Sequence, residues 1–159
     1  LMAGVALAQD TPVKGGSLVF ARDSEPLTLN PIGASDNGSI FMIVQIFDTL
    51  VETRDAPIPQ PGIAESWTVS DDSKTWTFAL RPGVKFSNGA DVTCEDVKFS
   101  IARMQTPMGP NPTTIYVRRV KEVQTPDPLT LRVITDGPAP NRSEEDPMLR
   151  SRFSTPRCT

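Results

Sequence analysis

The stretch "SWTVSDDSKTWTFALRPGVKFSNGADVTCEDVKFS", residues 66–100, carries the clearest pattern in this chain of 159 residues. Apolar and polar residues alternate over 66–70 and again over 75–80, which is the period of two half-buried β-strands. Residues 71–74 between them read Asp-Asp-Ser-Lys, and Asp and Ser favour turns because their side chains bond to nearby backbone. The beginning of the stretch therefore predicts a β-hairpin.

The second half of the stretch predicts a short strand over 84–86 and then a helix. Thr93 stands three residues before Asp96, a spacing that resembles a capping box with Asp in place of the usual Glu or Gln. A core face follows at helical spacing: Val97, Ser100, Ile101 and Met104.

The two tryptophans of the stretch admit a binding role or a core role. Either ring could stack on a ligand. Alternation, however, places Trp76 with Phe78 and Leu80 on one apolar face, and Trp67 with Val69 on another. We therefore expect core aromatic residues.

Outside this stretch, the pattern predicts a strand over 17–22 and a helix over 40–50 with Ser39 as its N-cap. The helix is apolar on most sides, so we expect it to be buried between layers. A second hairpin is expected over 115–135, with residues 125–128 as its turn. Sixteen prolines also favour short extended pieces over a helical bundle, and the fold class predicted is mixed α/β, strand-rich with a few helices.

Composition excludes several classes of function. The net charge is −3 and the basic residues are scattered, which predicts neither a nucleic-acid partner nor an anionic membrane surface. The chain has no histidine, so the usual general base and the commonest transition-metal ligand are missing. Cys94 and Cys158 lack CxxC spacing, which argues against zinc; we favour two unrelated thiols, with a disulfide in an oxidising compartment as the alternative.

The amino end indicates export. Residues 1–8 are apolar and rich in small side chains, and Ala6-Leu7-Ala8 fits the pattern before a signal-peptidase cut. We expect 1–8 to be the remnant of a signal peptide cleaved after Ala8; a frayed apolar terminus is the alternative. No stretch approaches the roughly 20 apolar residues that span a bilayer, so we expect no direct membrane insertion.

The order of these pieces resembles one family. The matching segments are "GGSLVFARDSEPLTLNP", "IFDTLVE", "IAESWTVSDDSKTWTFALRPGVKFSNGADVTCEDVKFSI" and "VQTPDPLTLRVIT". They are similar to the extracellular solute-binding proteins of the oligopeptide, dipeptide and nickel class, the periplasmic receptors of ATP-binding-cassette importers. The resemblance implies the N-terminal part of a two-lobe periplasmic-binding-protein-like fold.

Within this resemblance, residues 9–140 correspond to a partial N-terminal lobe and 141–159 to an atypical tail that composition predicts to be disordered. Members of the family are much longer, and strands built for a larger sheet would leave edges and apolar faces exposed. The function implied is capture of peptides or similar small solutes in the periplasm and docking on a membrane permease, without catalysis or a cofactor. The alternative is a truncated or frameshifted fragment with no binding function.

The ligand-binding residues that we predict lie in the loop "GASDNGS", residues 33–39: Ser35, Asp36, Asn37 and Ser39. Loops held by a rigid scaffold commonly carry binding, and in the proteins it resembles this region borders the ligand cleft. Asp36 could meet a ligand's ammonium group. For Ser39 a helix cap is an equal alternative. No catalytic or metal-binding residue is predicted. Asp71 and Asp72 form a carboxylate pair that could act as acid and base or bind a metal, but they fit a solvated turn better.

Overall fold

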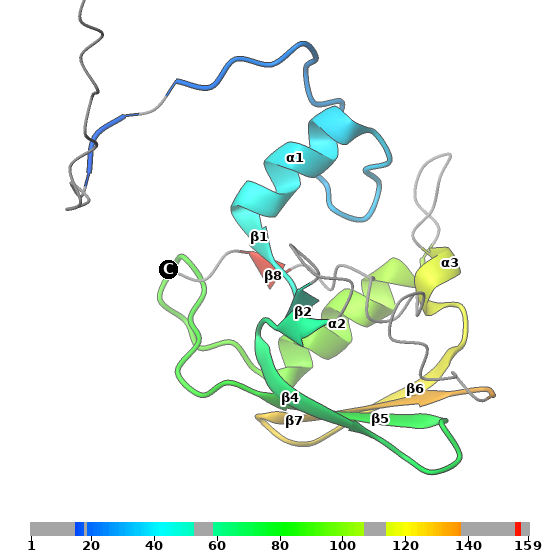
Figure 1. Ribbon diagram of the computed structural model, residues 1–159. Helices are drawn as coiled ribbons and strands as arrows, with labels where there is room; N and C mark the ends of the chain where they lie inside the picture. The colour runs from blue at the N-terminus through cyan, green and yellow to red at the C-terminus, as the bar shows by residue number, and fades with distance from the viewer. Residues whose placement is uncertain (1–14, 18, 53–58, 107–113, 138–154, 157–159) are drawn as a thin grey trace, which may run out of the picture.

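The computed structural model describes residues 15–17, 19–52, 59–106, 114–137 and 155–156 (Figure 1). Its elements, in chain order, are α1 (Asn37–Ile46), β1 (Phe47–Asp48), β2 (Val51–Glu52), β3 (Gln60–Pro61), β4 (Ala64–Val69), β5 (Thr75–Leu80), α2 (Cys94–Met104), α3 (Thr114–Val117), β6 (Val120–Asp127), β7 (Thr130–Thr135) and β8 (Thr155–Pro156). Mixed α/β architecture, rich in strands, is confirmed.

The main sheet has four antiparallel strands in the order β4-β5-β7-β6. The predicted hairpin of β4 and β5 is confirmed, with Trp67 opposite Phe78 and Val69 opposite Trp76. In its turn, Asp72 Oδ1 accepts hydrogen bonds from Ser70 Oγ at 2.6 Å and from the Lys74 N–H at 3.1 Å. The side-chain hydrogen bonds expected of a turn rich in Asp and Ser are therefore present.

One face of this sheet packs against α2 and forms the core (Figure 1). Trp76 and Phe78 are fully buried, and their rings stack with centroids 6.4 Å apart. Trp67 is partly buried against the same core. The predicted core position is confirmed for Trp76, and Trp67 packs against the core from a half-buried position.

The predicted capping box also forms at the start of α2. The Thr93 N–H and Oγ1–H groups both donate to Asp96 Oδ2, each at 2.8 Å. Val97, Ile101 and Met104 are buried as predicted, whereas Ser100 is half-buried. The shorter Asp side chain thus closes the box that Glu or Gln usually makes.

No strand forms in the described residues of the range 17–22, where one was expected. The described residues of this range adopt no strand and pair with no described strand, and Val19 and Phe20 are 93% and 66% exposed. Alternating sequence is not sufficient for a strand, because its backbone N–H and C=O groups need a neighbouring edge.

The expectation that the first helix is buried between layers is wrong. In α1, Ile43 is the one large apolar side chain that is buried, and Phe41, Met42, Val44 and Ile46 are 36–38% exposed. Figure 1 shows the reason: α1 projects away from α2 and the main sheet and joins them through β1. The helix also begins at Asn37 and ends at Ile46, earlier than expected.

The second hairpin is confirmed, but its turn is shifted. β6 extends to Asp127, and Pro128 and Leu129 connect it to β7. The cause is Asp127, whose Oδ1 accepts the N–H groups of Leu129 and Thr130, both at 2.9 Å. Residues 115–117, expected in the first arm, belong to α3, and the strand expected over 84–86 is reduced to a single bridge between Lys85 and Asp91.

Candidate ligand-binding site

The loop predicted over 33–39 overlaps α1, because Asp36 is the N-cap and residues 37–39 form the first turn of the helix. Its extended backbone, with φ −96° and ψ 150°, lets Asp36 Oδ1 accept a hydrogen bond from the Ser39 N–H at 2.7 Å. This bond to the Ser39 backbone lowers the pKa of the Asp36 carboxyl below its ordinary value. The cap is thus Asp36, and the alternative that gave this role to Ser39 is wrong.

Ser39 instead fastens the preceding segment to the helix. Its side chain is fully buried, and Ser39 Oγ accepts a hydrogen bond from the Thr28 N–H at 3.0 Å. Gly38 lets the backbone approach, since a Cβ there would lie 2.9 Å from the Glu25 carbonyl oxygen. No local sequence pattern predicts this hydrogen bond, because Thr28 and Ser39 are eleven residues apart.

The base of the loop is also held by local hydrogen bonds. Asn30 Oδ1 accepts from the Ile32 N–H at 3.2 Å, and the Asn30 carbonyl accepts from the Gly33 N–H at 3.2 Å. Thr28 Oγ1 accepts from the Asn30 N–H at 3.0 Å. The polar tip of the loop is therefore presented by a fixed scaffold, as a binding loop requires.

The four predicted residues divide into two pairs. Asp36 and Ser39 hold the local fold, while Ser35 and Asn37 are exposed on either side of Asp36. The exposed Ser35 and Asn37 thus flank the Asp36 cap at the start of α1, whereas the Ser39 side chain is buried. Ligand contact by any of the four stays a prediction.

A pocket of about 470 Å³ lies next to this scaffold and was not anticipated from the sequence. It is lined by Leu29, Asn30, Pro31, Ile32, Phe47, Phe86, Asp96, Phe99, Ser100, Arg103 and Met104. None of the four predicted residues lines it. Its walls come from separate segments of the chain, so no local sequence pattern signals it.

Other chemical groups in the described part of the chain suggest no second site. No cluster of three or more Cys, Asp or Glu side chains suited to a metal ion occurs among the described residues. Cys94 is a free, buried thiol, and burial raises its pKa to about 12, so it is a poor nucleophile. Cys158 lies outside the described residues. None of the helices in the described ranges has the length and hydropathy that crossing a bilayer requires.

The lowered pKa of Asp36 gives a testable pH dependence. Because the folded-state pKa lies below the ordinary 3.8, the cap contributes stability above pH 3.8 that is lost as the pH falls through the folded-state value. We expect Asp36→Asn, which keeps a capping oxygen, to show a smaller fall in urea midpoint between pH 5 and pH 3 than the parent chain. Asp71→Asn is the control, since it changes the charge equally without altering a cap; an identical pH profile for all three proteins would contradict the expectation.

Comparison with known proteins agrees with the order of these elements. A family model described as bacterial extracellular solute-binding proteins, family 5 Middle, matches residues 59–156. This range is more than half of the chain and extends past residue 140 to include β8. The chain is 29% identical over 147 residues to the probable D,D-dipeptide-binding periplasmic protein DdpA of Escherichia coli K12, covering 86% of this chain and 28% of DdpA.

Two further similar proteins were found, one by its sequence and one by its solved structure. The periplasmic oligopeptide-binding protein OppA of E. coli K12 is 35% identical over 124 residues, covering 74% of this chain and 23% of OppA. The binding protein AgaA from A. tumefaciens R10, solved with agropinic acid, matches with a TM-score of 0.72 and 29% identity, over 83% of this chain and 26% of AgaA. This chain therefore spans about a quarter of the length of these relatives. Since the family model covers more than half of it, the chain belongs to the bacterial extracellular solute-binding proteins of family 5.

Proposed function

We propose that this chain acts as a substrate-binding component of an ATP-binding-cassette importer, capturing peptides or similar small solutes. Family membership supports this proposal, as do the names of the relatives, which describe binding of oligopeptides and of D,D-dipeptides. The observation that carries it in this chain is the loop 33–39, a polar tip held by the Asp36 cap and by the bond between Ser39 and Thr28.

The proposed contacts follow from the groups at the tip. The Asp36 carboxylate is ionised at neutral pH, as an ordinary aspartate is, and the hydrogen bond from the Ser39 N–H lowers its pKa further. One carboxylate accepts several hydrogen bonds, so Asp36 retains capacity for a ligand's ammonium group. Ser35 and Asn37 would add a hydroxyl and an amide on either side, groups that pair with peptide N–H and C=O groups.

The same proposal includes location and partners. We place the mature chain in the periplasm after cleavage following Ala8, with a membrane permease as its protein partner. Residues 1–14 lie outside the described part, so the cleavage site rests on the sequence pattern. Solute capture requires neither a reaction nor a cofactor, and we propose that the chain is not an enzyme.

Titration of the ¹⁵N-labelled chain with a mixture of tri- and tetrapeptides tests the binding role. We expect amide chemical shifts to change mainly at residues 33–39. Asn37→Ala should weaken binding about three- to tenfold, the effect of one lost hydrogen bond, without changing the unfolding midpoint.

Asn88→Ala is a matched control, since it removes an amide from a different exposed turn. Its affinity should equal that of the parent chain. Absence of any shift change in a chain shown to be folded, or changes confined to another region, would contradict the proposed role of the loop.

A further inference from the structure

The pocket of about 470 Å³ has no part in the proposed function, because none of the four predicted contact residues lines it. Its volume falls within the roughly 300–1,000 Å³ of sites that bind small molecules. Such sites combine apolar walls with a few polar groups that orient the ligand. The walls of this pocket have that composition, so their chemistry indicates which ligand fits.

Most of the lining is apolar, and three of its side chains are aromatic: Phe47, Phe86 and Phe99. They come from β1, from the loop between β5 and α2, and from α2 itself. Phe47 and Phe86 are half-buried, and Phe99 is exposed. Aromatic side chains gain from stacked or edge-to-face contact with another ring. The apolar part of the pocket therefore favours a ligand that carries an aromatic ring.

The helix α2 supplies a polar wall. Asp96, Phe99, Ser100 and Arg103 all line the pocket, and their spacing of three, four and seven residues places them on one face of the helix. The buried positions of α2 lie on a different face, which packs against the main sheet. Figure 1 shows α2 between this sheet and α1. The pocket is thus on a side of α2 that the core does not use.

The charged groups of this wall differ in what they already bind. Asp96 Oδ2 accepts the N–H and Oγ1–H groups of Thr93, each at 2.8 Å, and so belongs to the capping box. The Arg103 side chain has no ion pair or hydrogen bond within the described ranges of the chain. A guanidinium group binds a carboxylate through two parallel hydrogen bonds. Arg103 is therefore the group of this wall best placed to bind an acidic ligand.

We propose that this pocket binds an aromatic monocarboxylate, a small molecule that joins an aromatic ring to one carboxylate through a short apolar chain. The ring contacts the three phenylalanines, and the carboxylate pairs with Arg103. Asp96 lies seven residues from Arg103, about 10 Å along the helix axis, and repels a second negative charge at that end. The site is separate from residues 33–39, so this proposal does not rest on the proposed function.

Titration of the full ¹⁵N-labelled chain with 4-phenylbutyrate measures the affinity and locates the site. We expect amide shifts to change mainly at residues 29–32 and 96–104. Two probes share the ring and the chain length: 4-phenylbutanol carries no charge, and 4-phenylbutylamine carries the opposite charge. Both should bind at least about tenfold more weakly than 4-phenylbutyrate, since neither forms the charged pair with Arg103.

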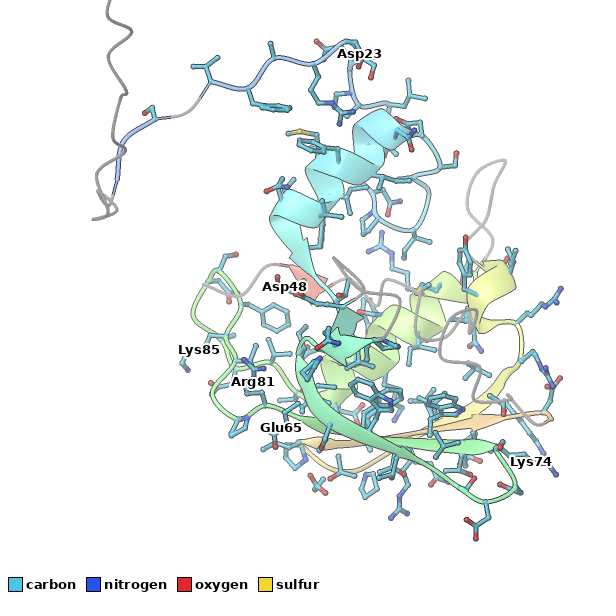
Figure 2. The ribbon with its side chains drawn as sticks, in the orientation of Figure 1. Asp23, Asp48, Glu65, Lys74, Arg81 and Lys85 are labelled. Carbon is cyan, nitrogen blue, oxygen red and sulfur yellow. The ribbon has the colours of Figure 1, made fainter. Side chains whose placement is uncertain are left out.

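Variants of two wall residues test the same contacts. Arg103→Gln should weaken binding of 4-phenylbutyrate at least about tenfold, and Arg103→Lys, which keeps the charge without the paired donors, should weaken it less. Phe99→Ala should weaken it about three- to tenfold. Arg81→Gln is the matched control, because it changes the charge equally outside the pocket; Figure 2 shows Arg81 on the loop that also carries Lys85. Its affinity should equal that of the parent chain.

Four results would overturn the proposal. The folded chain could fail to bind 4-phenylbutyrate, or it could bind all three probes equally. Tighter binding of the amine would show that Asp96 rather than Arg103 selects the ligand. Equal losses in Arg103→Gln and Arg81→Gln would reduce the effect to general attraction between charges. The peptide titration that tests residues 33–39 is read at different amides, so either proposal can fail without the other.

Discussion

Phe78→Ala is expected to lower the free energy of unfolding by about 3–5 kcal/mol. Phe78 is fully buried in the centre of the main sheet, opposite Trp67 on β4 and Leu131 on β7. Its ring also stacks on Trp76. Truncation removes these contacts and leaves a cavity between two hairpins, and a domain of this size has a total stability of only about 5–15 kcal/mol.

Phe99→Ala is the matched control for this prediction, because the Phe99 side chain is 67% exposed on α2. The expected change is within about 0.5 kcal/mol. Urea unfolding followed by the fluorescence of Trp67 and Trp76 measures both variants. Equal losses for the two positions would mean that the core does not lie between α2 and the sheet as described.

Gly62→Ala is expected to cost about 3 kcal/mol, through a steric conflict between backbone segments. A Cβ at Gly62 would lie 2.3 Å from the Thr49 carbonyl oxygen and 3.0 Å from that of Leu50. The same two carbonyl groups accept hydrogen bonds from the N–H groups of Ile63 and Ala64, both at 3.0 Å. A backbone shift that relieves this clash would break these two hydrogen bonds. They join the start of β4 to residues 49–50, which follow α1 and β1.

Gly33→Ala supplies the control for this second prediction. At Gly33 the nearest atom to an added Cβ is Asn30 Nδ2 at 3.9 Å, an ordinary contact. The unfolding midpoint should change little, or rise slightly because alanine restricts the unfolded chain. A Gly62→Ala protein as stable as Gly33→Ala would show that residues 49–50 and 62 are not in close approach.

The features predicted correctly from the sequence are those stabilised by near neighbours. Asp72 makes its turn by bonding to residues two positions away, and Asp96 closes its capping box over three positions. Alternation in β5 identified Trp76 and Phe78 as core residues, because a strand exposes and buries side chains in turn. The ligand-binding role of Ser35, Asp36, Asn37 and Ser39 stays a prediction, since no contact in the structure tests it.

The features predicted wrongly depend on contacts between distant segments. Whether Ser39 caps the helix or anchors Thr28 is decided by the extended backbone of Asp36 and by a segment eleven residues earlier. The second turn is an exception, since its position was decided locally, by the N–H groups of Leu129 and Thr130 that donate to Asp127. The pocket beside the loop is formed by several separate segments, so its lining was not predictable from local pattern.

The sequence by itself therefore determined the hairpins, the capped helix α2, the tryptophan core and the family to which the chain belongs. Only the tertiary structure decided that the described residues of 17–22 pair with no described strand, that most large apolar side chains of α1 are exposed, and that β7 lies between β5 and β6. The physical reason is the range of the interactions. Turns and caps are completed by residues a few positions away, whereas pairing of a strand and burial of a helix require a second surface that local sequence does not describe.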